Sequence, residues 1–266
     1  MRILRLEEDS AFSLVECVGR DIPLYAILSH TWGVDHEEVT FKDLAENTAK
    51  TKTSYRKLTF CGKQAAKDYL QFFWVDTCCI DKSSSAELTK SINSMFKWYQ
   101  NAAKCYVYLS DVSIKINGFT EAEQSFQTSR WFSRGWTLQE LVAPNSVEFF
   151  TAEGVRLGDK NSMIQIIHNI TGVPFQALQG TPLSHFSIDD RMLWAGRRET
   201  KREEDAAYSL LGIFDVHMPL LYGEGVDQAF GRLKKEIYQG MHSSIRYAKR
   251  DNALTESNRH TRNTAS

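Results

Sequence analysis

The segment SRWFSRGWTLQELVAP, residues 129–144, gathers side chains that could bind and cleave a ligand. It holds two tryptophans (Trp131 and Trp136), two arginines (Arg130 and Arg134) and one carboxylate, Glu140. A tryptophan ring suits a planar base, an arginine suits a pyrophosphate, and a fixed carboxylate stabilises positive charge that develops on a sugar ring. Either arginine could equally be a surface charge or a local salt-bridge partner.

Helical geometry separates the apolar residues of this segment from Glu140. At about 100° per residue, Leu138, Leu141 and Val142 cluster on one side of a helix, while Trp136 and Glu140 lie together on the opposite side. The first group can dock on a sheet and the second can face a cleft. A plain alternative stays open, in which Glu140 is solvated and Trp136 packs under the second half of the chain.

A second group of candidates follows the apolar run YAILSH, residues 25–30, which predicts a strand. Ser29, His30, Thr31, Trp32 and Gly33 are expected in the loop after it, where a phosphate or ribose could bind. Ligands of parallel α/β sheets lie beyond the carboxyl ends of the strands. The alternative is a self-satisfied turn in which His30 is hydrogen-bonded locally.

Asp76 and Asp81 flank TCCI at the end of another apolar run, FFWVDTCCI, residues 72–80. Two acids there could bind Mg²⁺ in a nucleic-acid enzyme, but the chain has no GxxxxGK[ST] phosphate loop. We therefore expect Asp76 to cap a strand, Asp81 to start a helix, and no metal site. Asp76 could still contact a ribose. We expect no tightly bound cofactor.

The elements that must position these residues alternate between strands and helices over the first half of the chain, which predicts an α/β fold with a mostly parallel sheet. Residues 151–240 are expected to form a helical extension, and the polar residues 241–266 a disordered linker. The expected strands cover residues 25–30, 72–80, 104–112 and 146–150, and the expected helices 55–70, 85–102, 162–170, 187–198, 202–214 and 226–240.

Composition narrows the class of protein. The 266 residues carry 32 basic and 33 acidic side chains, so charge gives no case for binding nucleic acid or an acidic membrane. No run approaches the roughly 20 apolar residues of a membrane span. Five cysteines without CxxC spacing favour neither disulfides nor a zinc site, so Cys78 and Cys79 are expected to fill the core of a reduced, cytoplasmic protein.

Several motifs together resemble the fungal HET (heterokaryon incompatibility) domain that begins vegetative incompatibility proteins of the NOD-like receptor type. They include YAILSHTWG, FWVDTCCIDKSSSAELTKSINSMFKWYQNAAKCYVYLSDV, SRWFSRGWTLQELVAP and MPLLYGEG, and the resemblance covers residues 1–240. It implies a death-inducing effector of non-self recognition. In receptor-type members, NACHT and WD-repeat modules follow the HET domain, so the resemblance implies such modules as downstream partners.

Two motifs also resemble TIR domains, YAILSHTWG at the first strand and Trp136–Glu140–Leu141 in SRWFSRGWTLQEL. This resemblance implies a flavodoxin-like sheet and NAD cleavage by Glu140 after self-association, with Ser29 to Gly33, Asp76, Arg134 and Trp136 holding the dinucleotide. The rival expectation is a non-enzymatic module that recruits partners through Trp131 and Trp136.

Overall fold

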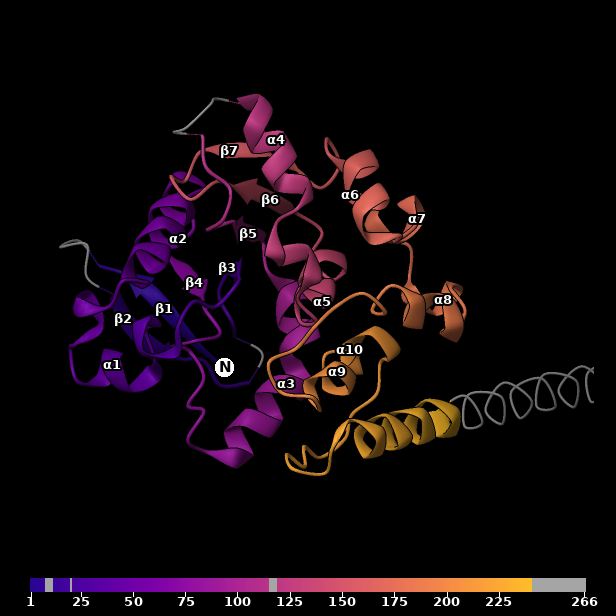
Figure 1. Ribbon diagram of the computed structural model, residues 1–266. Coiled ribbons are helices and arrows are strands. Elements are labelled where there is room, and N and C mark those ends of the chain that lie inside the picture. The colour runs from indigo at the N-terminus through magenta and orange to yellow at the C-terminus, as the bar shows by residue number, and fades with distance from the viewer. Residues whose placement is uncertain (8–11, 20, 115–118, 241–266) are drawn as a thin grey trace, which may run out of the picture.

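The computed structural model describes residues 1–7, 12–19, 21–114 and 119–240, so the predicted linker 241–266 lies outside the described residues. In these ranges seven strands form one sheet in the order β2-β1-β4-β3-β5-β6-β7 (Figure 1). The strands are β1 (Arg2–Leu6), β2 (Phe12–Glu16), β3 (Tyr25–His30), β4 (Phe72–Trp74), β5 (Lys104–Tyr108), β6 (Val147–Phe150) and β7 (Arg156–Asp159).

The centre of the sheet is parallel and its edges are antiparallel. β4, β3, β5 and β6 run parallel, whereas the β1–β2 hairpin and β7 pair antiparallel on either side. In chain order the parallel strands lie 2-1-3-4, as in doubly wound flavodoxin-like sheets. The α/β prediction is confirmed, and the TIR likeness of the sheet stays a prediction. The sheet is more mixed than predicted, and β7 extends it past the expected boundary at residue 150.

Helices cover both faces of the sheet. α2 (Tyr55–Lys67) packs on β1, β3 and β4, whereas α5 (Thr137–Val142) packs on β3 with α3 (Ser85–Asn101) against it on the other face (Figure 1). The smaller helices are α1 (Phe41–Ala45), α4 (Phe119–Gln127), α6 (Ile164–Thr171), α7 (Phe175–Leu178), α8 (Ile188–Leu193), α9 (Asp205–Tyr208) and α10 (Leu211–Phe214).

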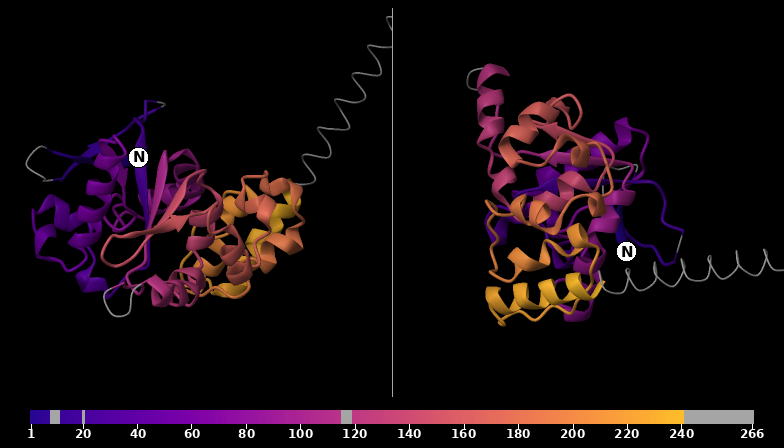
Figure 2. Two further views of the ribbon diagram at one scale, coloured as in Figure 1. Left: turned by 90° about the horizontal axis from the view of Figure 1, so that it is seen from above. Right: turned by 90° about the vertical axis from the view of Figure 1, so that its right-hand side faces the viewer.

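The second half of the chain is helical, as predicted, and packs beside α3 and α5 (Figure 2). Its helix 226–240 follows the predicted pattern, and Ser187 and Asp190 form the predicted capping box of α8. The segment 202–214 breaks into two short helices, α9 and α10, instead of the single helix expected. No helix among the described residues is long and apolar enough to cross a bilayer.

The core is continuous from the sheet into the second half. β3 is buried along its whole length, and α10 packs on α3 so closely that a Cβ at Gly212 would lie 2.1 Å from the Cβ of Phe96. Cys78 and Cys79 are free, buried thiols, which confirms their predicted place in the core. They lie in a turn, because β4 ends at Trp74 rather than continuing to residue 80 as expected.

Candidate functional site

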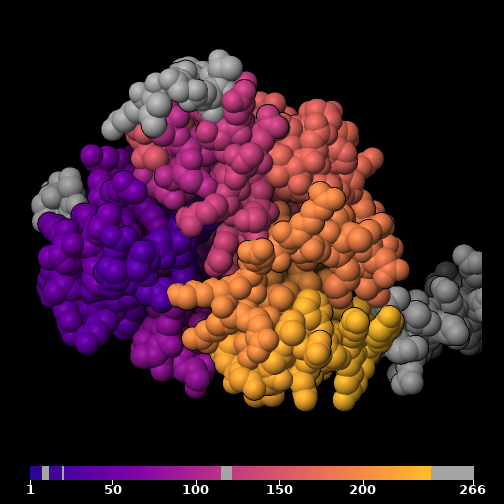
Figure 3. All heavy atoms as spheres, in the orientation of Figure 1, coloured from indigo at the N-terminus to yellow at the C-terminus, as the bar shows by residue number. Residues whose placement is uncertain are grey.

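A pocket of about 160 Å³ lies at the carboxyl ends of β3 and β4 and is closed on one side by the second half of the chain. The first and second halves of the chain lie against each other in the space-filling view (Figure 3). Its polar and aromatic walls come from His30, Trp32, Asp76, Lys82, Arg134, Trp136, Thr137, Glu140, Lys201, Arg202, Asp205 and Tyr222, and its apolar floor from Ile80, Leu88, Ile92 and Met95.

Glu140 reaches this pocket from α5, although its side chain is buried between α5 and the sheet. The hydroxyl of Ser29 on β3 donates a hydrogen bond to Glu140 Oε2. The indole Nε1 of Trp131 in turn donates to Ser29 Oγ at 2.8 Å. The hydroxyl of Tyr99 from α3 lies near the same carboxyl group and donates its own hydrogen bond to the carbonyl of Leu28 at 3.0 Å. The pair of Ser29 and Trp131 therefore holds the carboxyl of Glu140 in a fixed orientation at the edge of the pocket.

The surroundings of Glu140 favour its protonated form. Burial raises the pKa of Glu140 and the nearby charge of Asp76 raises it further, while the hydrogen bond from Ser29, the nearby hydroxyl of Tyr99 and the charge of Arg198 oppose the shift. The net effect is a pKa of about 8. A carboxyl in this state keeps its proton near neutral pH until a positive charge enters the pocket.

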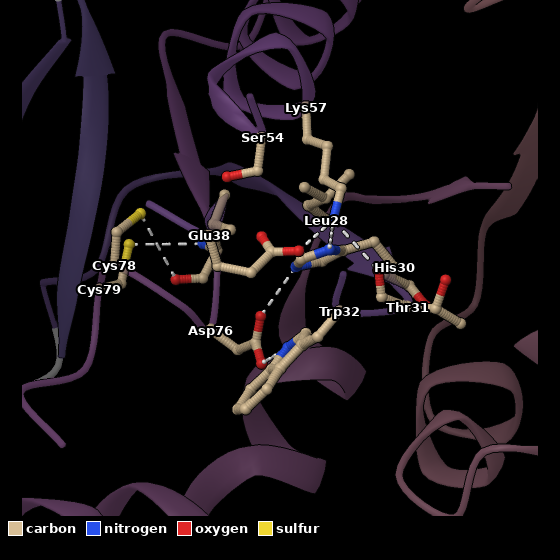
Figure 4. Close-up of polar contacts among 12 residues, drawn as sticks. Leu28, His30, Thr31, Trp32, Glu38, Ser54, Lys57, Asp76, Cys78 and Cys79 are labelled. Carbon is tan, nitrogen blue, oxygen red and sulfur yellow. Dashed lines mark hydrogen bonds and ion pairs between the residues drawn. The ribbon is translucent and has the colours of Figure 1, made fainter. Parts of the chain in front are cut away.

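A chain of hydrogen bonds fixes His30, another residue of the pocket wall (Figure 4). Lys57 Nζ contacts His30 Nδ1 at 3.1 Å and donates to Glu38 Oε1 at 2.5 Å. An ammonium group can only donate, so Nδ1 accepts and the imidazole proton sits on Nε2. His30 Nε2 then donates to Asp76 Oδ1 at 3.0 Å. With both ring nitrogens engaged, His30 positions Asp76 and is not free to act as a base.

Asp76 is the second carboxylate of the pocket, and its environment is opposite to that of Glu140. Its other oxygen, Oδ2, accepts a hydrogen bond from Trp32 Nε1 at 2.8 Å (Figure 4). Burial alone would raise the pKa of Asp76, but the charge of Lys82 and the hydrogen bonds from His30 and Trp32 outweigh burial and lower it to about 2. One pocket thus combines an ionised carboxylate with a protonated one.

The second half of the chain closes the pocket through Trp136. Its indole Nε1 donates to Asp205 Oδ2 at 3.3 Å, and the hydroxyl of Tyr222 donates to Asp205 Oδ1 at 2.9 Å. The guanidinium of Arg202 lies 4.2 Å above the Tyr222 ring. Trp136 and Glu140 therefore both line the cleft at β3, and Trp136 also contacts the second half of the chain.

Six of the predicted site residues line the pocket together: His30, Trp32, Asp76, Arg134, Trp136 and Glu140. The other three do not line it. Ser29 lies beneath Glu140, Thr31 accepts a hydrogen bond from Lys57 through its carbonyl, and Gly33 donates its N–H to Glu38. Ser29 and His30 belong to β3 itself, which corrects their predicted place in the loop that follows.

Other sequence-based expectations for this region need correction. Trp131 is fully buried, so it is not exposed for contact with a partner in this structure. Trp136 is hydrogen-bonded to Asp205. Arg130 approaches Asp111 and does not line the pocket. Asp81 accepts hydrogen bonds from Ser83 in the turn before α3.

The described residues contain no group of three His, Cys, Asp or Glu side chains arranged around a metal position. At the start of α9, Glu204 Oε1 accepts hydrogen bonds from the N–H groups of Gly223 and Gly225. Lys57, Tyr99 and Arg198 were not predicted from the sequence, because their contacts with the pocket residues span long separations along the chain.

Comparisons with known proteins agree with the motifs. Residues 25–117 match the family model described as heterokaryon incompatibility protein (HET). The chain is 59% identical over 219 residues to the vegetative incompatibility protein HET-E-1 of Podospora anserina. This match covers 81% of the chain but 16% of the relative, so the chain spans a small part of that protein. No solved structure matches the chain.

Proposed function

Because the chain carries a HET domain, we propose that it acts in vegetative incompatibility and that its pocket cleaves the bond between nicotinamide and ribose in NAD. The observation that supports cleavage is the placement of Glu140, a buried carboxyl fixed by Ser29 at the edge of a pocket that Trp32 and Trp136 also line. Four cations, Lys82, Arg134, Lys201 and Arg202, line the same pocket and suit an anionic, phosphate-bearing ligand.

The chemistry needs a carboxylate but no acid. When the bond from the ribose C1 to the nicotinamide nitrogen breaks, the electron pair leaves with nicotinamide, which departs neutral because it was cationic. Positive charge develops on the ribose ring, and a fixed carboxylate stabilises it. Water then adds to C1 and loses one proton, which gives ADP-ribose. Glu140 is the catalytic residue of this scheme, and the pair of indoles offers faces for the nicotinamide ring.

The raised pKa of Glu140 fits this role. The protonated form removes the cost of a buried charge from the empty pocket, and the cationic nicotinamide riboside favours ionisation when it arrives. Asp76 stays ionised and adds negative potential on the same side. Lys82 and Arg202, which line the same pocket, would meet the phosphates. We further propose that the domain works in the cytoplasm and that self-association activates it.

The test is release of nicotinamide from NAD by purified chain, alone and fused to a segment that forces it to cluster. We expect wild type to release nicotinamide and Glu140→Gln to lose at least about a hundredfold in rate, the scale of one transition-state electrostatic contact. Glu148→Gln is the matched control, since Glu148 is a buried glutamate of β6 outside the pocket, paired with Lys104 and Arg156. Equal rates for wild type and Glu140→Gln would refute the proposal.

A further inference from the structure

A second, larger pocket of about 760 Å³ adjoins the first. The two pockets share one wall, which consists of Trp32, Ile80, Lys82, Lys201 and Arg202. The first pocket holds about 160 Å³ and is small for a whole dinucleotide, whereas the second falls within the range of roughly 300–1,000 Å³ typical of ligand sites. The two pockets therefore adjoin through this shared wall.

The shared wall is cationic. Lys82 lies 3.7 Å above the Trp32 ring and Arg202 lies 4.2 Å above the Tyr222 ring. Neither makes an ion pair within the part of the chain that the structure describes, and only Lys201 of the shared wall is paired, with Asp35. Two cations that rest on aromatic rings and make no ion pair can bind an anion, and a pyrophosphate that bridges the two pockets would meet both of them.

The second pocket offers an aromatic ring and a hydroxyl that has no hydrogen-bond partner among the described residues. Phe41 and Ala45 of α1 form one side of it, and Thr77 from the turn after β4 forms another. Thr77 is 4% exposed, and its Oγ1 has no hydrogen-bond partner among the described residues. A buried hydroxyl without a partner costs free energy, so such a group at a pocket wall points to a polar ligand atom that would satisfy it.

We propose that the second pocket binds the adenosine half of a dinucleotide whose pyrophosphate lies across the shared wall, and that Thr77 hydrogen-bonds this half. This inference rests on the proposed cleavage in the first pocket and names the substrate as a dinucleotide rather than a mononucleotide. The catalytic carboxyl and the adenosine site are then separated by the length of a pyrophosphate.

The test compares NAD with nicotinamide mononucleotide, which lacks the adenosine half. Ala45→Trp places a bulky ring in the second pocket from an exposed position that does not line the first. We expect KM for NAD to rise about tenfold or more, while KM for nicotinamide mononucleotide stays within about twofold of wild type. Lys50→Trp is the control, since Lys50 is exposed near α1 and lines neither pocket. Equal effects of Ala45→Trp on both substrates, or none on NAD, would overturn the inference.

Binding of ADP, measured by calorimetry, separates this inference from the proposed reaction. We expect wild type to bind ADP, Thr77→Val to weaken binding several-fold without loss of stability, and Ala45→Trp to abolish it. If wild type cleaves neither substrate but these binding results hold, the cleavage proposal fails and the adenosine site stands. If ADP does not bind, or Ala45→Trp leaves its affinity unchanged, the adenosine site is wrong whatever the fate of the reaction.

Discussion

Replacing Glu140 with glutamine separates what this residue costs the fold from what it contributes to chemistry. In wild type the carboxyl has a pKa of about 8 in the folded chain, against its usual 4.5. Between these values the folded state holds a proton that the unfolded state has released, so stability falls as pH rises. One pH unit corresponds to about 1.4 kcal/mol, so this one group removes about 3 kcal/mol between pH 5 and pH 7.

Glutamine is uncharged at every pH, and its carbonyl can still accept the hydrogen bond from Ser29. We therefore expect the free energy of unfolding of Glu140→Gln to exceed that of wild type by an amount that grows by about 3 kcal/mol over this pH range. Urea unfolding at about pH 5, 6, 7 and 8, taken as the difference between the two proteins, cancels all other titrating groups. A difference that is constant with pH would refute the raised pKa. A gain in stability together with a loss of activity is the expected signature of a functional site.

Two other substitutions test the supports of the site, both by urea unfolding. Lys57→Met leaves the buried carboxylate of Glu38 without its ion-pair partner and should lower the free energy of unfolding by about 3–5 kcal/mol. Adding Glu38→Gln should restore part of this loss, whereas additive losses from the two changes would contradict their pairing. Gly212→Ala forces a methyl group against Phe96 and should cost about 1–3 kcal/mol, whereas Gly231→Ala, which meets nothing within 4 Å, should be neutral or stabilising. Similar behaviour of the two glycine variants would contradict the close packing of α10 on α3.

Much of the fold could be predicted from local patterns. The amphipathic spacing of Leu88, Ile92 and Met95 predicts α3, and the apolar run 25–30 predicts β3 within the bounds observed. The β1–β2 hairpin was not predicted, because strands of mixed polarity at the edge of a sheet carry a weak signal, as β2 shows with no fully buried residue. Segment 72–80 was assigned too long a strand, because a buried turn is as apolar as a buried strand.

The candidate site was predictable only in part, for a similar reason. Helical spacing places Trp136 and Glu140 on one surface, and both do line the pocket. The contacts that give Glu140 its properties join it to Ser29, 111 residues away, and Ser29 to Trp131, 102 residues away. Periodicity reports which face of an element is apolar, but not which distant side chain meets it, so the burial and pKa of Glu140 become visible only in the folded chain.

The pH dependence of kcat/KM for NAD tests the central claim most directly, because it reports the ionisation of groups in the free protein. If the carboxylate form of Glu140 stabilises the ribosyl cation, the rate should rise tenfold per pH unit from about pH 6 and level off above a pKa of about 8. A profile that is flat over this range, or that falls as pH rises, would contradict the assignment of Glu140 as the catalytic carboxylate.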